Sequence, residues 1–308
     1  MGWQEIDGTD SSAIGGKRMR PTLAMLAAEA VGGDLERATP IAVALEYVHN
    51  FSLIHDDLED MDRMRHHRPT VWAVWGKSAA IISGNAMLKI ADLAVWKLRS
   101  VGVEDSIALE AEAELTQQYL KMMEGQYLDI SFETEESVSV PQYLDMIERK
   151  TGALIEASVY LGGLVGPSSG PNRQKAVALK AIGHELGRIF QIRDDVLGIW
   201  GGKETGKPVG ADIKRKKKAL PAIHALNMSR GASASRIKDI FRTQDDLKEK
   251  DIHEVLEIME SLETQNYCQS MAAERWMDCK QMIKSLNLSG QTAKEFTELG
   301  EFLLIRES

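Results

Sequence analysis

The stretch HNFSLIHDDLEDMDRMRHHRPTVW, residues 49–72, leads from an apolar run into a dense group of charges. Acidic residues occupy five of the seven positions from 56 to 62, and five Arg and His residues follow before Pro69. Adjacent like charges destabilise a helix unless a cation lies among them. Asp56 and Asp60 share one helical face, with Asp57 beside them. Carboxylates so arranged suit Mg²⁺, and Arg beside His suits phosphate. The alternative is a solvated, charged helix end.

Composition and charge are those of a soluble globular protein. The 308 residues are 44% apolar and 27% charged, with no run near the roughly 18–20 apolar residues of a membrane-spanning helix. The formal net charge of −9 argues against a nucleic-acid partner. Cys268 and Cys279 lack the spacing of a zinc site or a disulfide framework. Together with a polar N-terminus, these features predict a cytoplasmic protein without stable membrane insertion.

Helical periodicity dominates the chain, and neither two-residue alternation nor a βαβ rhythm is present. We expect helices over residues 22–31, 38–61, 71–99, 106–132, 141–165 and 172–199, with four or five more after 219. Ser83-Gly84-Asn85 predicts a break in the third of these. The small residues between 151 and 163 predict a surface that another helix or a ligand approaches closely. The resulting prediction is an all-α fold with a single domain over residues 1–308, of which 1–14 are loose.

A second acidic pair, Asp194-Asp195, lies within an apolar helical segment. Burying two adjacent carboxylates without partners is costly, and a loop rich in lysine follows them, including the run Lys214–Lys218. Two aspartate-bearing helices that face each other across a bundle would hold two or three Mg²⁺, and the surrounding cations would hold a diphosphate. The alternatives are a solvated helix end for the pair and a solvated loop for the lysines.

Six motifs in order resemble those of one family. They are Gly15-Gly16-Lys17-Arg18-x-Arg20-Pro21, Asp56-Asp57-x-x-Asp60, Gly125-Gln126-x-x-Asp129, Lys150-Thr151, Phe190-Gln191-x-x-Asp194-Asp195 and Gly206-Lys207. The chain from Gly15 to about Arg306 thus resembles the trans-isoprenyl diphosphate synthases, the polyprenyl synthetase family, and in particular the bacterial short-chain geranylgeranyl type. The family's extra helix before Gly15 has no counterpart, which predicts a truncated N-terminus.

The resemblance implies an isoprenoid-synthase-type helical bundle around a deep central cavity, formed as a homodimer. The implied reaction joins isopentenyl diphosphate head to tail to an allylic diphosphate. In such chemistry Mg²⁺ neutralises the leaving diphosphate, and electrostatic preorganisation replaces a strong side-chain nucleophile. The preferred product is C20 geranylgeranyl diphosphate, with C15 farnesyl diphosphate next.

Matching positions supply the expected roles. The implied metal ligands are Asp56, Asp60 and Asp194, and the other catalytic positions are Asp57, Lys150, Thr151, Gln191, Asp195 and Lys207. The implied substrate-binding positions are Lys17, Arg20, His49, Arg65 and Lys217. Structural alternatives stay open for several of them: surface charges for Lys17 and Arg20, a core histidine for His49 and a packing role for Thr151. Gln126 and Asp129 are left outside the site, because a helix–helix hydrogen bond explains them equally well.

Four positions depart from the family pattern. His66 stands where a second arginine is usual, and a histidine holds diphosphate with pH dependence. Gly198 removes the last acidic residue of the second motif. Asn85 replaces a common Asp, and Ala219 a common Thr. These departures bear on kinetics more than on the type of reaction.

Product length is expected to depend on Phe51 and Ser52, which precede Asp56 by five and four residues. A single Phe about one turn below the metals would stop chain growth after a few isoprene units. Two other functions are alternatives. A terpene cyclase on the same fold would not need Lys17, Arg20, His49 and Arg65, and a non-catalytic regulatory partner would not need intact aspartates. The sequence does not choose the allylic primer or the pathway.

Overall fold

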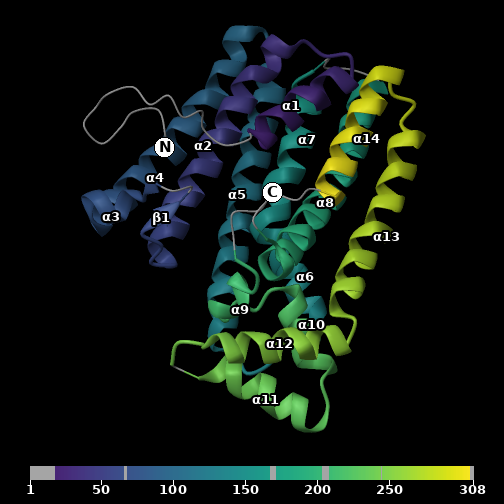
Figure 1. Ribbon diagram of the computed structural model, residues 1–308. Helices are drawn as coiled ribbons and strands as arrows, with labels where there is room; N and C mark the ends of the chain where they lie inside the picture. Colours follow the sequence, from purple (N-terminus) through teal and green to yellow (C-terminus); the bar gives the residue numbers. More distant parts are fainter. Residues whose placement is uncertain (1–17, 66–67, 167–170, 203–207, 244, 306–308) are drawn as a thin grey trace. The chain divides into compact units, whose positions relative to one another are not determined.

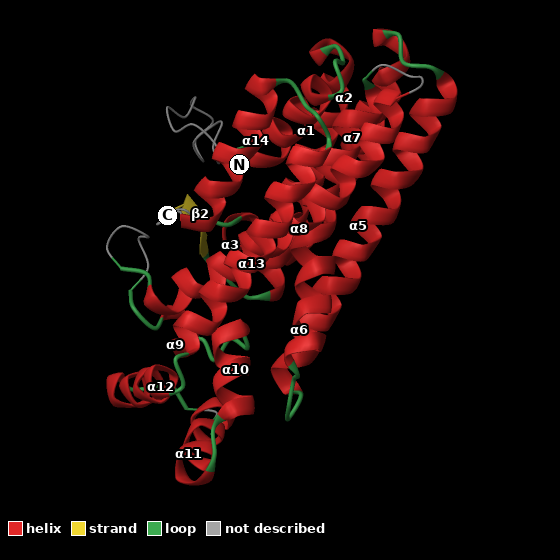
Figure 2. Cartoon of the chain, turned by 90° about the vertical axis from the view of Figure 1, so that its right-hand side faces the viewer, coloured by secondary structure: helices red, strands yellow, loops and turns green. Residues whose placement is uncertain are grey.

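The computed structural model describes residues 18–65, 68–166, 171–202, 208–243 and 245–305, and nearly all of them are helical (Figure 1). The strands among them are β1 (Met64–Arg65) and β2 (Arg68–Pro69), which pair in antiparallel fashion. Figure 2 shows this pair in yellow against a background of helices. The predicted all-α class is confirmed.

The chain forms two compact units. Unit 1 comprises Met1–Tyr119 and Ala157–Lys180, and unit 2 comprises Leu120–Glu156 and Ala181–Ser308. Three helices contribute residues to both: α5 (Asp105–Thr134), α7 (Ala153–Val165) and α8 (Pro171–Trp200). A single domain remains a prediction.

Unit 1 is organised around α2 (Leu35–Glu59), which packs along α4 (Lys77–Trp96). The Asp34 carboxylate caps α2 by accepting a hydrogen bond from the Glu36 backbone N–H at 2.8 Å. The other elements of this unit are α1 (Met19–Ala30), α3 (Val71–Trp75) and the 3₁₀ turn η1 (Lys97–Val101).

Small residues allow the helices of unit 1 to approach closely. A Cβ at Gly162 of α7 would lie 2.0 Å from the Ala24 carbonyl oxygen of α1, which confirms the predicted close-packing surface. The predicted break at 83–85 is wrong, because Gly84 lies inside α4. A Cβ there would lie 2.2 Å from Nε2 of His55 on α2. Gly84 is therefore a packing residue and not a helix breaker.

Unit 2 contains α6 (Val140–Ile147), which begins with a capping box between Ser139 and Gln142. The π-helical turn η2 (Glu148–Gly152) joins α6 to α7, where the sequence predicted one regular helix. The remaining helices are α9 (Ala211–Lys214), α10 (Leu220–Met228), α11 (Gly231–Arg242), α12 (Glu249–Ser261), α13 (Thr264–Ser285) and α14 (Gly290–Ile305).

Two apolar clusters form the core around α10. One joins Tyr143 and Met146 of α6 to Leu220 and Ile223 of α10, and the other joins α10 to α11 and α12. Figures 1 and 2 show α11 and α12 next to α10, and Figure 1 shows α14 running back along α13. This packing fixes α8, which carries the second acidic motif, and α10, which directly follows the lysine run.

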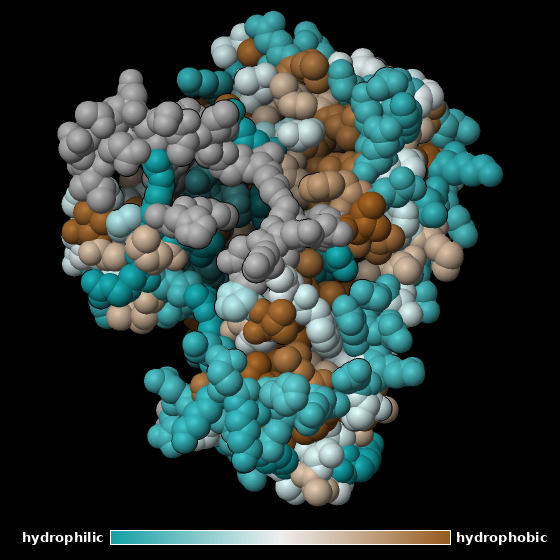
Figure 3. Space-filling view, viewed as in Figure 1, coloured by the Kyte–Doolittle hydropathy of each residue, from teal (hydrophilic) through white to brown (hydrophobic). Residues whose placement is uncertain are grey.

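One helical stretch of the described residues, Lys77–Val101, is long and apolar enough to cross a membrane by length and composition alone. Only 28% of its most apolar window is buried. Its exposed side chains include Ile82, Leu93 and Trp96, which lie on one face, and Trp75 of α3 precedes it. Apolar side chains are visible at the surface over α3 at the left edge of Figure 3.

Candidate active site

The end of α2 carries the first acidic motif in a graded environment. Asp57 is buried, Asp56 is half-buried and Asp60, the C-cap residue, is exposed. The Arg65 guanidinium of β1 donates to Asp57 Oδ1 at 2.6 Å and to Asp56 Oδ2 at 3.3 Å. Burial raises the pKa of Asp57, and the Arg65 contact opposes this rise. Arg65 therefore neutralises the acidic turn in this structure.

The loop after the motif is fixed by backbone contacts of Asp62. Its carbonyl oxygen accepts from the Thr70 hydroxyl and from the Trp72 indole N–H, each at 2.8 Å. The Arg63 guanidinium lies 5.3 Å from the centre of the Trp72 ring. These contacts hold the β1–β2 pair and with it Arg65, so Asp62 has a structural role through its backbone carbonyl.

A basic group lies close to this motif. Arg20 of α1 is half-buried, and desolvation of its guanidinium lowers its pKa to about 10. Within the described residues its buried Nε has no hydrogen-bond partner. The pKa of His49 is well below its usual range, first because of burial and then because of the charges of Arg20 and Arg65. Two arginines beside a neutral histidine, with an unused buried donor on Arg20, fit an anionic ligand such as a diphosphate.

Phe51 and Ser52, the residues expected to limit product length, have different environments. Phe51 is 4% exposed, and its ring meets the His55 ring edge-on with centroids 5.0 Å apart. The Ser52 hydroxyl donates to the His49 carbonyl oxygen of its own helix at 2.8 Å. Phe51 is thus the bulkier candidate for limiting product length.

In unit 2, Asp195 of α8 is 1% exposed and fully engaged. One oxygen accepts from the Tyr143 hydroxyl and from the Leu220 N–H, and the other accepts from Gln191 Nε2 at 2.9 Å. Burial raises the pKa of Asp195 to about 6, so the group is ionised at neutral pH. Its hydrogen bonds orient Gln191, which in turn accepts from the Thr151 hydroxyl at 2.7 Å.

Lys217 lies among carboxylates. Burial alone would lower its pKa, but the charges of Asp195, Asp212, Asp129 and Asp194 raise it well above the usual range. Its neighbours hold the loop in place. Lys216 Nζ donates to the carbonyls of Thr243 and Asp245 at 2.8 and 2.7 Å, and Lys218 Nζ donates to the Phe132 carbonyl at 2.6 Å. The interpretation of the lysine run as a solvated loop fits only Lys214 and Arg215, which are exposed.

Two acidic residues that sequence reasoning left out belong to this group. Asp129 of α5 forms an ion pair with Lys150 of η2. Asp212 is buried, and a Cβ at Gly198 would lie 2.1 Å from its Oδ2. The Asp212 carboxylate thus occupies the space next to Gly198, where the family motif has an acidic side chain. Its position five residues before Lys217 was the available sequence clue.

The comparisons with known proteins identify the family. The family model for polyprenyl synthetases matches residues 8–259. The chain belongs to the polyprenyl synthetase family. Members of this family are prenyltransferases, so the predicted enzyme class is confirmed.

Named relatives agree with this assignment. A (2E,6E)-farnesyl diphosphate synthase of Mycobacterium bovis is 36% identical, over 100% of this chain and 84% of that protein. A geranylgeranyl diphosphate synthase of Mycobacterium tuberculosis is 37% identical, over 89% of this chain and 77% of that protein. The crystal structure of a polyprenyl synthetase from Streptomyces coelicolor A3(2) has a TM-score of 0.89 and 34% identity, covering 99% of this chain and 89% of that one.

Several expected synthetase residues have no structural description here. Lys17, His66 and Lys207 lie outside the described residues. Within the described residues, no group of three or more His, Cys, Asp or Glu side chains is arranged to hold a metal ion. Mg²⁺ usually takes one or two protein carboxylates and completes its shell with water and substrate phosphate oxygens. Asp56 and Asp60 on the last turn of α2, and Asp194 on α8, are oxygen donors of that kind.

Proposed function

We propose that this synthetase joins isopentenyl diphosphate to an allylic diphosphate, head to tail, in a Mg²⁺-dependent reaction. The product is a short all-trans prenyl diphosphate, preferentially C20 and next C15. The observation that carries the proposal is the place of Arg65. It contacts Asp56 and Asp57 at the end of α2, and its charge acts together with that of Arg20 on His49. The relatives named as farnesyl and geranylgeranyl synthases support both product lengths.

The allylic substrate would be bound through its diphosphate. Asp56, Asp60 and Asp194 are the proposed Mg²⁺ ligands, and Lys150, Lys207 and Lys217 are the proposed diphosphate cations. Bound Mg²⁺ would supply Lewis-acid neutralisation of the leaving diphosphate. The lysines contribute fixed positive charge where negative charge develops, which is how preorganised electrostatics lower a barrier.

The cationic end of the allylic chain would be met by neutral oxygens. Thr151 and Gln191 already share a hydrogen bond at 2.7 Å, and Gln191 is held by buried Asp195. Oxygen dipoles fixed in this way stabilise a developing carbocation without attacking it as a strong nucleophile would. Asp57 supports Asp56 through their shared contact with Arg65.

Isopentenyl diphosphate would be bound by Lys17, Arg20 and His49, with Arg65 exchanging one of its carboxylate contacts for the ligand. The lowered pKa of His49 keeps its ring neutral at neutral pH, so it binds by donating a hydrogen bond. Retention of Arg20 and His49 favours a synthase over a terpene cyclase, because a cyclase has no second substrate. The aspartates of both motifs likewise favour an enzyme over a regulatory partner.

We further propose a cytoplasmic homodimer formed through the exposed apolar face of α4. Ile82, Leu93 and Trp96 are 68%, 60% and 62% exposed. Such a face is unusual on a soluble monomer and typical of a subunit interface. A protein that stays dimeric without detergent would support this assignment, and one that partitions into lipid vesicles would contradict it.

The direct test of this function uses the purified chain, radiolabelled isopentenyl diphosphate and geranyl diphosphate. Incorporation of label into a longer prenyl diphosphate supports the synthase. Cyclic hydrocarbon from geranyl diphosphate alone would support the cyclase instead. His49→Gln is expected to raise KM for isopentenyl diphosphate more than KM for the allylic substrate, because only the former is assigned to this group.

A further inference from the structure

The π-turn η2 (Glu148–Gly152) presents two residues of the proposed allylic site in succession. Lys150 reaches Asp129 on α5, and Thr151 reaches Gln191 on α8. π-turns are rare, appear mostly as single turns inside α-helices and are frequent at functional sites. A widened turn has no intrinsic preference over a regular helix, so tertiary contacts must hold it.

Packing provides part of that support. A Cβ at Gly125 of α5 would lie 2.1 Å from the Lys150 backbone nitrogen. A Cβ at Gly187 of α8 would lie 2.7 Å from the Gly152 Cα. The turn is therefore pressed between two helices that each carry a glycine at the contact. Close packing limits its position but does not fix its rotation.

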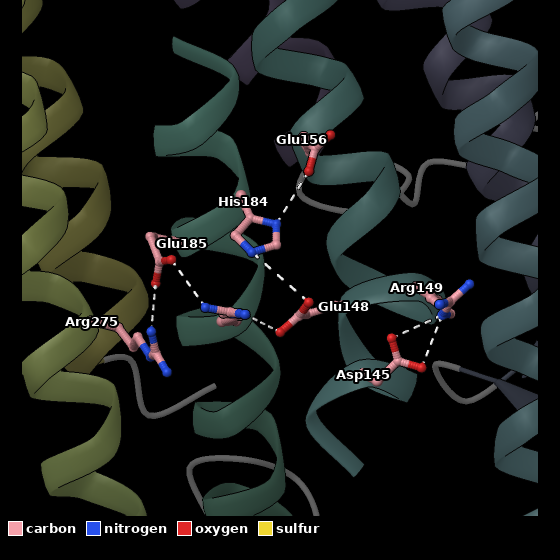
Figure 4. Close-up of polar contacts among 8 residues, drawn as sticks. Asp145, Glu148, Arg149, Glu156, His184, Glu185 and Arg275 are labelled. Atoms are coloured by element: carbon pink, nitrogen blue, oxygen red, sulfur yellow. Dashed lines mark hydrogen bonds and ion pairs between the residues drawn. The ribbon is translucent and has the colours of Figure 1, made fainter. Parts of the chain in front are cut away.

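A half-buried ion pair supplies a directional contact. Arg188 Nη2 of α8 contacts Glu148, the first residue of the turn, and Arg188 Nη1 donates to Glu185 Oε1 at 3.1 Å. The side chains of Glu148, Arg188 and Glu185 are 24%, 18% and 9% exposed.. Figure 4 shows Glu185 extended toward Arg275, 3.9 Å away. The opposite oxygen of Glu148 lies 3.9 Å from His184 Nε2.

Helical spacing links this pair to the active-site residues. Arg188 and Gln191 are three residues apart and share one face of α8. Arg188 holds the first residue of the turn, and Gln191 holds Thr151 near its end. One face of one helix therefore contacts both ends of the turn. Ion pairs are weak evidence for stability at either extreme of burial, so this half-buried pair calls for another explanation.

We infer that Arg188 and Glu148 are positioning residues for the condensation. Their ion pair fixes the rotation of η2 and so directs Lys150 and Thr151 toward the allylic substrate. This inference rests on the proposed function of Lys150 and Thr151. Neither Arg188 nor Glu148 touches the reacting atoms in this account, so their effect reaches the chemistry through the turn.

Arg149 offers a matched control within the same turn. Its guanidinium pairs with Asp145 at 3.0 Å (Figure 4) and with Glu124 at 2.7 Å. All three side chains are more than one-third exposed. Exposed pairs of this kind contribute little to stability. Arg149→Gln removes one positive charge from the exposed side of the turn, as Arg188→Gln removes one from the half-buried side. It leaves the Arg188–Glu148 pair intact.

The test compares Arg188→Gln with Arg149→Gln in the full-length protein. Arg188→Gln is expected to lower kcat about 10- to 100-fold, as small misplacements of reacting groups do. Its KM for isopentenyl diphosphate should stay within about twofold, because that substrate is assigned to other residues. Amide hydrogen exchange should accelerate in residues 148–156 and stay unchanged in α2. Arg149→Gln should match the wild type in all three measurements.

Each other outcome is informative. A folded Arg188→Gln protein with wild-type kcat overturns the inference, as does a uniform rise in exchange over the whole chain with kcat unchanged. If Arg188→Gln does not fold, Glu148→Gln breaks the same ion pair from the side of the turn, and full kcat in that variant overturns the inference too. If the wild type itself does not condense the substrates, the proposed function fails, and the exchange comparison still shows whether the pair holds the turn.

Discussion

Truncating Phe51 is expected to lengthen the prenyl product. Phe51 precedes Asp56 by five residues in α2, which places it about 7.5 Å along the helix axis from the first proposed metal ligand. An allylic chain that extends from a diphosphate at Asp56 toward the N-terminus of α2 meets the Phe51 ring after a few isoprene units. Phe51→Ala removes that obstacle, and Phe51→Leu removes part of it.

The structural cost of this change sets the design of the experiment. Phe51 is 4% exposed, and truncating a buried Phe to Ala costs about 3–5 kcal/mol. Since total stability is typically about 5–15 kcal/mol, the variant should fold with a lowered Tm. Ile54→Ala is a matched control, because Ile54 is 5% exposed on the same helix but packs against Trp72 and Ala80.

The assay is chromatographic product analysis with geranyl and farnesyl diphosphates as primers, run beside thermal unfolding. Phe51→Ala should shift the distribution to products longer than those of the wild type, and Phe51→Leu should shift it less. Ile54→Ala should lose a similar stability and keep the wild-type distribution. A folded Phe51→Ala protein with unchanged products would refute the reasoning and move the limit elsewhere, for example to Met122 and Met123 on α5.

Three further changes test separate parts of the account. Gly198→Asp, which restores the usual motif, is expected to lower stability and activity because its side chain would overlap the Asp212 carboxylate; improved activity would contradict this. Leu93→Glu should convert a dimer to monomers in light scattering, and an unchanged mass would place the interface elsewhere. Burial lowers the pKa of His224. In the unfolded chain this histidine binds a proton below about pH 6.5, whereas in the folded chain it binds the proton only at a lower pH. The free energy of unfolding should therefore fall as the pH drops through that range. Thermal unfolding should show a smaller loss of stability for His224→Asn than for the wild type between about pH 7.5 and pH 5. Equal losses would contradict the assignment.

Local sequence rules predicted most of the helices. Gly32-Gly33-Asp34 correctly marked the end of the first helix, which stops at Ala30. The second helix was expected from about residue 38 but begins at Leu35, where Asp34 caps its first turn. Pro141 correctly marked the start of α6. These elements follow from capping and from backbone restrictions, which depend on a few neighbouring residues. They were predictable for that reason.

The errors came from contacts between distant segments. Gly84 was expected to break a helix, but it accommodates His55 from α2 inside a continuous α4. The π-turn at 148–152 has no local signature, because it depends on Gly125 and Gly187 in two other helices. Helix propensity describes a residue within its own helix and does not include contacts with side chains of another helix.

The candidate site was predictable at the level of residue types and less so at the level of partners. Thr151 and Gln191 were assigned to the same role, and the structure joins them by a hydrogen bond. Arg65 was assigned to a substrate, but here it pairs with Asp56 and Asp57. Motif matching names positions and cannot show which charge neutralises which when no ligand is bound. The roles of these residues in catalysis stay predictions.

Product analysis of the wild-type protein tests the central proposal most directly. The purified chain would be given radiolabelled isopentenyl diphosphate with dimethylallyl, geranyl or farnesyl diphosphate, with Mg²⁺ and with a chelator. We expect label in all-trans prenyl diphosphates that end mainly at C20, and none when the metal is removed. No incorporation with any primer in the presence of Mg²⁺, or full incorporation in the presence of the chelator, would contradict the account.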